Sequence, residues 1–540
     1  MKQIRDPHSL FSKKLDLAHM VEMIKPVEDE EIKIALFDID DNKSPGPDGF
    51  SSKFFKSMWD TVSKDFCAAV KEFFESGEML KEINATVIAL IPKKDTPCFV
   101  SDFRPISCCT VIYKCISKIM VGRIRNHLSS IVSENQSAFI PGKSIIDNIL
   151  LSQELVKGYH RNRGYPRCAL KVDIQKAYDT VNWDFLRSIL GQFGFHPVMI
   201  RWIMKCVESS SFTLSINGEY HGYFEGKRGL RQGCPLSPYL FTLVMETFSL
   251  ILNRKISQEP LFKYHWKCKQ QKITHLCFAD DLMLFCNGNK ASVRIIKDAL
   301  EEFAGIAGLQ PNVSKSHIFF GNVRERTKLK ILETLPFVEG KLPMRYLGIP
   351  LITNRLFVRD CKTLVDKVRK RLGDWKNKLL SYAGRLQLIS AVLSSIPVYW
   401  ASTMLIPMAT VKEIEKLMRR FLWNCEDTSK GKAKVSWDSI CKPLKFGGLG
   451  LRSLRKWNVA ILSDRIWRIL SQHNSLWAKW VNIHLLDGRS LWDNQKRFNL
   501  SWSWRNLLSI RPEVREAFVN FIGNGQITNF WFDNWHALAL

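Results

Sequence analysis

Three aspartates stand beside apolar segments whose composition is typical of strands. Asp173 closes one such segment, whereas Asp280 and Asp281 separate two others, at 273–278 and 282–286. This pattern predicts a hairpin with an acidic turn. Carboxylates at the end of one strand and in a neighbouring hairpin could share two Mg²⁺ ions about 4 Å apart, the arrangement that transfers a phosphoryl group to a 3′-hydroxyl.

Asp280 and Asp281 also have a simpler interpretation, because adjacent aspartates in a turn are commonly just solvated. The apolar flanks favour a metal site, since burying a carboxylate pair without cations is costly. From these residues alone, both interpretations stay open.

The elements that must position these aspartates follow from the apolar and turn-forming residues. Residues 41–49 are rich in Pro, Gly, Asp and Asn and predict a loop after a charged helical leader at 1–40. Asn182 and Ser237 are expected to cap helices that reach about residues 193 and 254. Further helices are expected over 52–75, 112–128, 292–307 and 359–379, strands over 86–92 and 168–174, and a hairpin over 212–224.

The length and charge of the chain limit what it can be. Its 540 residues suggest two to four packed domains. Lys and Arg number 79 against 52 Asp and Glu, a net charge of +27. Such an excess favours a polyanionic partner, and nucleic acid in particular, over a merely basic protein.

Cysteine spacing and hydropathy bear on location. No two of the 14 cysteines have C-x-x-C spacing, so we expect reduced thiols rather than a zinc site. No secretory signal is visible at residues 1–20. The uncharged stretch at 386–411 is long enough to span a bilayer, but its prolines favour two buried helices broken near Pro397. The expectation is a nuclear or cytoplasmic protein that is not secreted, has no transmembrane segment and has no membrane partner.

A set of short motifs surrounds the aspartates. Phe278-Ala279-Asp280-Asp281 resembles the (F/Y)-x-D-D box of reverse transcriptases, and residues 173–179 (DIQKAYD) and 228–238 (RGLRQGCPLSP) resemble two further palm motifs. Other matches are 44–49 (SPGPDG), 90–93 (LIPK), 102–107 (DFRPIS) and 138–142 (AFIPG). Together, over about residues 30–470, they resemble the reverse transcriptase (RNA-directed DNA polymerase) of plant non-LTR retrotransposons of the LINE type.

This resemblance implies an α+β right-hand polymerase fold. Its parts would be a helical leader, fingers, a ferredoxin-like palm with an antiparallel sheet and helices on one face, a helical thumb, and a Trp-rich C-terminal region. The corresponding ranges are 1–40, 41–165, 166–351, 352–430 and 431–540.

The resemblance also assigns roles at the reaction centre. Asp173, Asp280 and Asp281, with the carbonyl of Ile174, would bind two Mg²⁺ ions, with Mn²⁺ as a possible substitute. Lys315 would be catalytic by protonating the pyrophosphate leaving group, although a structural lysine is the alternative.

Nucleotide binding is implied for a second set of residues. Lys93 and Arg104 would hold the triphosphate, although a solvated basic face is the alternative for Lys93. Tyr178 would exclude a 2′-hydroxyl and so select dNTPs. Gln232 and Gly233 would lie against the incoming nucleotide and the template.

Two further features complete the comparison. Cys234 departs from the family, which often has Asp there; this could weaken nucleotide binding or be neutral. Tyr346, Leu347 and Gly348 resemble the primer grip, and the basic helix after Arg359, which includes Lys378, resembles the thumb that tracks a duplex backbone.

The predicted activity is extension of a primer 3′-hydroxyl with dNTPs along an RNA template, with DNA primer and RNA–DNA hybrid as partners. The oligomeric state is not indicated. Alternatives are an inactive retrotransposon relic that binds nucleic acid and a group II intron maturase. An RNA-dependent RNA polymerase is disfavoured by Tyr178. Because neither an endonuclease nor a zinc or RNase H segment is visible, we expect a piece of a longer reading frame.

Overall fold

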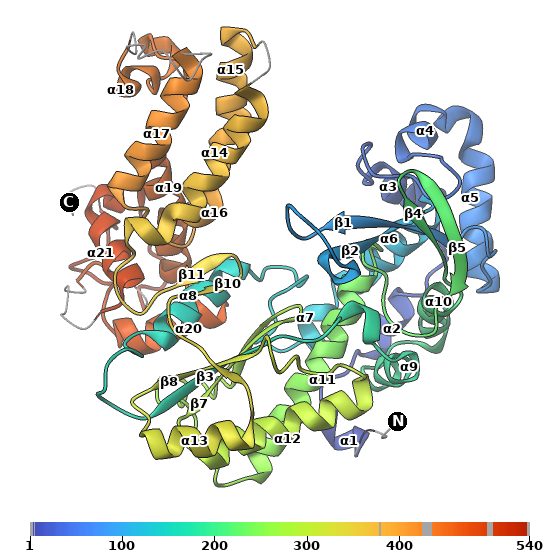
Figure 1. Cartoon of the computed structure of the whole chain (residues 1–540), viewed down its shortest axis with the longest axis horizontal. Helices are drawn as coiled ribbons and strands as arrows, with labels where there is room; N and C mark the ends of the chain where they lie inside the picture. The colour runs from blue at the N-terminus through green and yellow to red at the C-terminus, as the bar shows by residue number, and fades with distance from the viewer. Residues whose placement is uncertain are drawn as a thin grey trace. The chain divides into compact units, whose positions relative to one another are not determined.

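The computed structural model describes residues 4, 6–376, 380–423, 435–493, 500–526 and 528–536. The chain forms two compact units (Figure 1). The first unit comprises Met1–Lys143 and Tyr165–Glu339, and the second comprises Ser144–Gly164 and Gly340–Leu540. Helices and mostly antiparallel strands occur together, so the predicted α+β class is confirmed.

A five-stranded sheet in the first unit has the order β6-β7-β3-β8-β9. The central strand β3 pairs antiparallel with β7 and β8, and its apolar residues are buried, as expected of an interior strand. Helix α12 packs against β7, and α11 packs against α12 and α9. The strands are β3 (Arg167–Val172), β6 (His275–Phe278), β7 (Asp281–Asn287), β8 (His317–Gly321) and β9 (Val338–Glu339), and the helices are α9 (Trp183–Gln192), α11 (Ser237–Gln258) and α12 (Lys290–Ala307).

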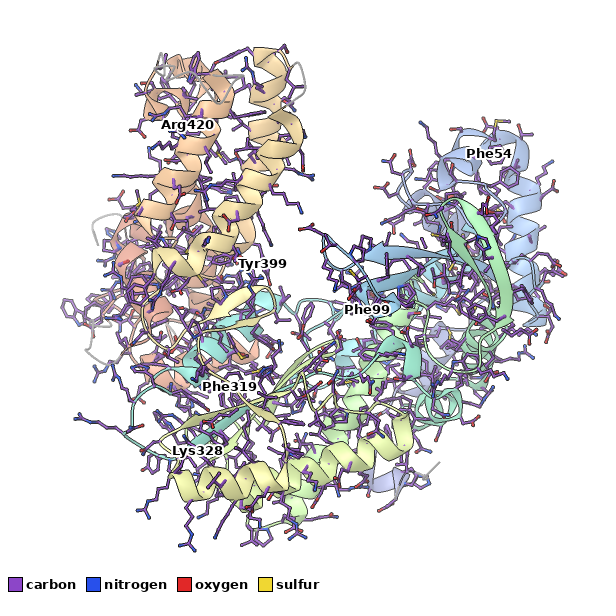
Figure 2. The ribbon with its side chains drawn as sticks, in the orientation of Figure 1. Phe54, Phe99, Phe319, Lys328, Tyr399 and Arg420 are labelled. Carbon is purple, nitrogen blue, oxygen red and sulfur yellow. The ribbon has the colours of Figure 1, made fainter. Side chains whose placement is uncertain are left out.

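A four-stranded sheet, also in the first unit, has the order β2-β1-β4-β5. Its strands β1 and β4 are parallel and come from distant parts of the sequence. Figure 2 shows Phe99 on the connection between β1 and β2, and Phe319 on β8 of the other sheet. The strands are β1 (Ala85–Pro92), β2 (Phe103–Cys109), β4 (Ser211–Ile216) and β5 (Glu219–Glu225).

The predicted leader is helical and is part of the core of the first unit. Phe11 packs edge-on against Phe193 with ring centroids 4.9 Å apart, and the Leu15 amide donates to the Phe193 carbonyl at 2.9 Å. The helices of this unit not yet named are α1 (Pro7–Leu10), α2 (Leu17–Glu22), α3 (Asp29–Phe37), α4 (Ser52–Ser57), α5 (Trp59–Ser76), α6 (Val111–Arg125), α7 (Leu128–Ile131), α10 (Pro197–Glu208) and α13 (Glu325–Thr334).

The helix starts expected at Ser237 and Ser292 differ from the structure. Asn182 does cap α9, because its side chain accepts from the Phe185 amide at 2.7 Å. Ser237 does not cap α11: it is already helical, and the cap position is Leu236, whose backbone is in the right-handed helical region. Helix α12 begins at Lys290 rather than Ser292, because Asn289 caps it by accepting from the Ser292 amide.

Where the structure describes the second unit, it is helical apart from one short hairpin. Helix α14 packs on α17, α19 packs on α17 and α21, and α8 packs on α20 and β11. The elements are α8 (Ile145–Val156), β10 (Met344–Tyr346), β11 (Ile349–Leu351), α14 (Lys362–Lys376), α15 (Tyr382–Leu388), α16 (Val398–Ala401), α17 (Met408–Trp423), α18 (Trp437–Ile440), α19 (Leu454–Leu470), α20 (Leu476–Val481) and α21 (Trp502–Val514). The expected basic helix begins at Lys362, and Lys378 lies outside the described residues.

The uncharged stretch at 386–411 is broken near Pro397, as predicted. Its residues divide among α15, a π-helical turn at Ile389–Leu393, α16 and the start of α17, and Pro397 is the N-cap of α16. In the parts of the chain that the structure describes, no helix is both long and apolar enough to cross a bilayer.

Candidate active site

The three aspartates lie at one end of the five-stranded sheet. Val172 pairs with Leu282 across β3 and β7, and Asp173 and Asp281 continue this register by one position. Phe278 pairs with Asp281 where the β6–β7 hairpin closes, so the predicted hairpin is confirmed. The turn between them includes Ala279, which has a left-handed backbone with φ 54°. Register and turn together make the carboxylates neighbours.

Asp173 is held in place by the loop that precedes β8. Its backbone amide donates to the Ser316 hydroxyl at 3.1 Å, and its carbonyl accepts from the Asn312 amide at 2.7 Å. The following residue, Ile174, forms an isolated antiparallel bridge with Pro311. These bonds fix the backbone of Asp173 and Ile174 against β8 without using the Asp173 carboxylate.

Burial and neighbouring charges shift the pKa of two of the three aspartates. The surrounding protein displaces water and raises the pKa of both Asp280 and Asp281, although Asp280 keeps an exposed surface. The negative charge of Asp173 raises the pKa of both further, whereas Arg104 lowers that of Asp280 and Lys171 lowers that of Asp281. Like charges held together in this way favour binding of a cation.

The donor set suits a divalent metal by its chemistry. Three carboxylates supply the hard oxygen ligands that Mg²⁺ prefers, and Mg²⁺ completes its shell with water and substrate oxygens. Among the described residues, no group of three or more His, Cys, Asp or Glu side chains is arranged to ligate one ion. The aspartates are therefore neighbours without converging on one point.

Tyr178 lies beside this acidic cluster. Its ring stacks on Phe241 of α11, with centroids 4.6 Å apart and planes 16° apart. The Leu230 amide donates to the Tyr178 carbonyl at 2.7 Å. Burial and the charge of Asp280 both raise the pKa of the Tyr178 hydroxyl. The Tyr178 hydroxyl is therefore neutral near the carboxylates, and the Phe241 ring supports one face of the Tyr178 ring.

Gln232 and Gly233 lie between β2 and the turn that contains Asp179. The Gln232 carbonyl accepts from the Ser107 amide at 2.7 Å, and its side-chain amide donates to the Asp179 carboxylate at 3.2 Å. Gly233 has φ 119°, and a Cβ there would come within 2.7 Å of the Ser107 carbonyl oxygen. Close approach of β2 therefore requires glycine at this position.

A buried cation next to this segment was not anticipated from the sequence. Arg231 lies 3.9 Å from the ring centroid of Tyr113 and donates to the Cys206 carbonyl at 2.9 Å and the Thr86 hydroxyl at 2.9 Å. The Tyr113 hydroxyl is 3.2 Å from the sulfur of Cys234. Cys234, which departs from the family motif, is thus a buried packing residue here. The residues around Arg231, Gly229-Leu230 and Gln232-Gly233, give no local signal of this burial.

The two predicted triphosphate contacts lie on the β1–β2 hairpin. Arg104 of β2 pairs with Ile91 of β1, and its positive charge lowers the pKa of Asp280. The Lys93 ammonium donates to the Ser101 carbonyl at 2.9 Å, on the same hairpin. The structure therefore brings Arg104 close to the acidic cluster, whereas Lys93 is held at the hairpin.

Lys315 occupies the loop that supports Asp173. Its amide donates to the side chain of Asn312 at 3.2 Å, and Asn312 is the residue whose own amide bonds the Asp173 carbonyl. The Lys315 side chain is exposed. Two hydrogen bonds through Asn312 thus link the Lys315 backbone to the Asp173 backbone.

The predicted primer grip forms the β10–β11 turn of the second unit. Tyr346 is buried at the end of β10, and Leu347 and Gly348 have left-handed backbones with φ of 48° and 78°. The Tyr399 hydroxyl donates to the Leu347 carbonyl at 2.6 Å. This bond fixes the turn to α16, and Figure 2 marks Tyr399.

Comparison with known proteins shows which family the chain resembles. Residues 91–351 match the family described as reverse transcriptase (RNA-dependent DNA polymerase). The chain is 29% identical over 443 residues to the transposon TX1 uncharacterized 149 kDa protein of Xenopus laevis, which covers 80% of this chain and 32% of that protein. It is 23% identical over 528 residues to the Pol polyprotein of retrotransposable element R2DM of Drosophila melanogaster, which covers 95% of this chain and 47% of that protein.

Two further proteins are similar. A putative ribonuclease H protein of Arabidopsis thaliana is 36% identical over 193 residues, or 35% of this chain and 31% of that protein. A solved structure of apo telomerase from Candida tropicalis has a TM-score of 0.35 and 16% identity, over 57% of this chain and 62% of that one. The chain spans about a third to a half of the length of these curated relatives. Residues 91–351 are therefore a reverse transcriptase domain of the non-LTR retrotransposon type.

Proposed function

We propose that this chain extends a primer 3′-hydroxyl with dNTPs along an RNA template by a two-metal mechanism that uses Mg²⁺, or Mn²⁺ in its place. The observation that carries the proposal is the placement of Asp173, Asp280 and Asp281 at one end of β3 and the β6–β7 hairpin, where the charge of Asp173 raises the pKa of both Asp280 and Asp281. Holding these carboxylates together costs free energy when no cation neutralises them. With two divalent ions bound, the same carboxylates would form a site for phosphoryl transfer.

Asp173, Asp280 and Asp281 would hold the ions, with the Ile174 carbonyl as a further ligand. When bound, two divalent ions activate the primer hydroxyl and stabilise the charge of the triphosphate. Arg104, which already acts on Asp280 electrostatically, and Lys93 would neutralise phosphate charge.

Tyr178, Gln232 and Gly233 would shape the nucleotide site. The Tyr178 ring is backed by Phe241 and cannot retreat, so a ribose 2′-hydroxyl above it would be excluded. Gly233, which admits the Ser107 carbonyl at close range, would hold Gln232 in position beside the nucleotide. Lys315 would deliver a proton to the departing pyrophosphate.

The second unit would contribute the primer and hybrid contacts. Tyr346, Leu347 and Gly348 form a fixed turn that suits a primer grip. The basic helix α14 would follow phosphates without sequence preference. We place the protein's origin in a plant LINE-type element, since Arabidopsis proteins are among its relatives, and its site of action in the nucleus or cytoplasm.

Primer extension tests the proposal. An oligo(dT) primer on poly(rA) should be extended with dTTP and Mg²⁺, and chelation with EDTA should abolish extension. Asp280→Asn keeps the size of the side chain and removes the charge, so it should lower the rate by at least about 10³-fold while the protein stays folded. Absence of synthesis by the unmodified chain with either Mg²⁺ or Mn²⁺ would favour the alternative, a relic that binds nucleic acid.

A further inference from the structure

A second surface of the first unit has the chemistry to bind nucleic acid. The loop 263–272 (KYHWKCKQQK), between α11 and β6, contains four lysines and no Asp or Glu. Four exposed residues of the loop, Lys263, Trp266, Lys269 and Lys272, are spaced three apart in the sequence, and Gln270 is exposed as well. The loop therefore presents cations and an aromatic ring to solvent, and these four residues are called the exposed row.

The complementary positions of this loop hold it rigidly. Phe262, His265 and Cys268, also three apart, are buried. The Cys268 amide donates to the His265 carbonyl at 2.8 Å, and the Ile273 amide donates to the Cys268 carbonyl at 3.1 Å. Burial lowers the pKa of His265 far below its ordinary value, so this ring is a neutral anchor. The exposed row is thus pre-organised, which lowers the entropy cost of binding.

A second exposed aromatic extends the row. Tyr165, just before β3, is 66% exposed and Trp266 is 46% exposed, and their ring centroids are 6.2 Å apart. The Lys267 ammonium lies 5.5 Å from the centroid of the Trp266 ring. Two aromatic faces among lysines form the combination that stacks unpaired bases and neutralises their phosphates.

This surface lies away from the carboxylates. The Asn287 amide, at the far end of β7 from Asp281, donates to the Lys263 carbonyl at 2.9 Å, and Tyr264 bridges Cys286. Strand β7 has seven residues, so about 20 Å of extended chain separates the two ends. A strand bound here would therefore contact protein outside the polymerase site.

We infer that the row formed by Tyr165, Lys263, Trp266, Lys269 and Lys272 is a binding site for single-stranded nucleic acid, separate from the site of synthesis. Stacking requires unpaired bases, so a duplex would bind weakly. The inference goes beyond the proposed function and does not depend on it, because a chain without polymerase activity would keep this surface.

Fluorescence anisotropy tests the inference. The labelled probes are a 15-nucleotide oligo(rU) and a 15-nucleotide oligo(dT), and excess unlabelled hairpin primer–template occupies the polymerase site. Trp266→Ala should lower affinity for the labelled strand about tenfold, and Trp266→Phe should restore most of it. Lys263→Ala/Lys269→Ala/Lys272→Ala should reduce the slope of log affinity against log salt by about 2.

A matched control has three other exposed lysines of the same unit replaced, Lys33→Ala/Lys53→Ala/Lys81→Ala, so that the net charge falls equally. It should bind the probes within twofold of the unmodified chain. If the loop variants lose affinity for oligo(rU) alone, the site binds single-stranded RNA. If they lose affinity for both probes, the site binds single-stranded RNA and DNA alike. Unchanged binding by Trp266→Ala and the triple variant, or equal loss in the control, would overturn it. Primer extension by the loop variants should stay within twofold, which separates this result from failure of the polymerase proposal.

Discussion

The guanidinium of Arg231 lies 3.9 Å from the ring centroid of Tyr113, and both side chains are buried. Arg231 also bonds the Cys206 carbonyl, so the planar group serves several partners at once. Arg231→Lys should lower the free energy of unfolding by about 2 kcal/mol or more, because an ammonium cannot stack and bond in the same way. Urea unfolding would measure this.

The companion variant Tyr113→Phe keeps the ring beneath Arg231 and removes the hydroxyl that contacts Cys234. It should cost about 1 kcal/mol. If Arg231→Lys were no more harmful than Tyr113→Phe, the stacked and bonded geometry would not be the stabilising feature.

Tyr178 should control the choice of sugar. Tyr178→Ala removes the ring that Phe241 supports, and should raise incorporation of rNTPs relative to dNTPs by at least about tenfold. Tyr178→Phe keeps the ring and should keep the selectivity. Single-nucleotide extension with dTTP and UTP measures both ratios, and equal selectivity in the alanine variant would exclude a steric role.

Asp281 should show opposite effects on activity and stability. Asp281→Asn removes one of the charges that repel each other at the end of the sheet, so the metal-free protein should gain about 1 kcal/mol of unfolding free energy. Primer extension should be lost. Adding Mg²⁺ should raise the melting temperature of the unmodified chain and leave that of the variant nearly unchanged; a variant less stable than the parent in EDTA would contradict this account.

Glu246 should make stability depend on pH. It is fully buried in α11, where desolvation raises its pKa to about 7 in spite of the Ser133 hydroxyl bond and the charge of Lys143 and Lys13. The folded chain therefore keeps a proton that the unfolded chain releases near pH 4.5. Between these values the folded state binds more protons, so this carboxyl lowers stability as the pH rises from about 4.5 to 7.

Glu246→Gln should remove that dependence and raise the free energy of unfolding above pH 7 by up to about 3 kcal/mol. Denaturant unfolding at pH 5 and pH 8 would measure it for both proteins. A difference between them that stays constant across this range would show that Glu246 does not titrate as described.

Local patterns predicted the acidic hairpin because its apolar runs and turn are contiguous in sequence. Strand β2 (Phe103–Cys109) was not predicted from the sequence, because polar and apolar residues do not alternate regularly along it. This strand forms through its antiparallel pairing with β1, which no local pattern contains. Helix α8 was missed because it is buried on all sides, Asp147 and Glu154 included, and has no polar stripe. Burial of Arg231 depends on carbonyls far away in the chain, which no local pattern contains.

The path of the chain through α8 has a practical consequence for making shorter versions of the protein. A fragment trimmed to the matched range 91–351 would contain α8 but not α20, against which α8 packs. It would also begin inside β1 and lack the leader and α3 to α5, so that Phe193 would lose its partner Phe11. Such a fragment should aggregate during expression, whereas a chain that begins at residue 1 and extends through α20 should remain dispersed. The shortest well-behaved chain is thus set by these packing partners rather than by the limits of sequence similarity.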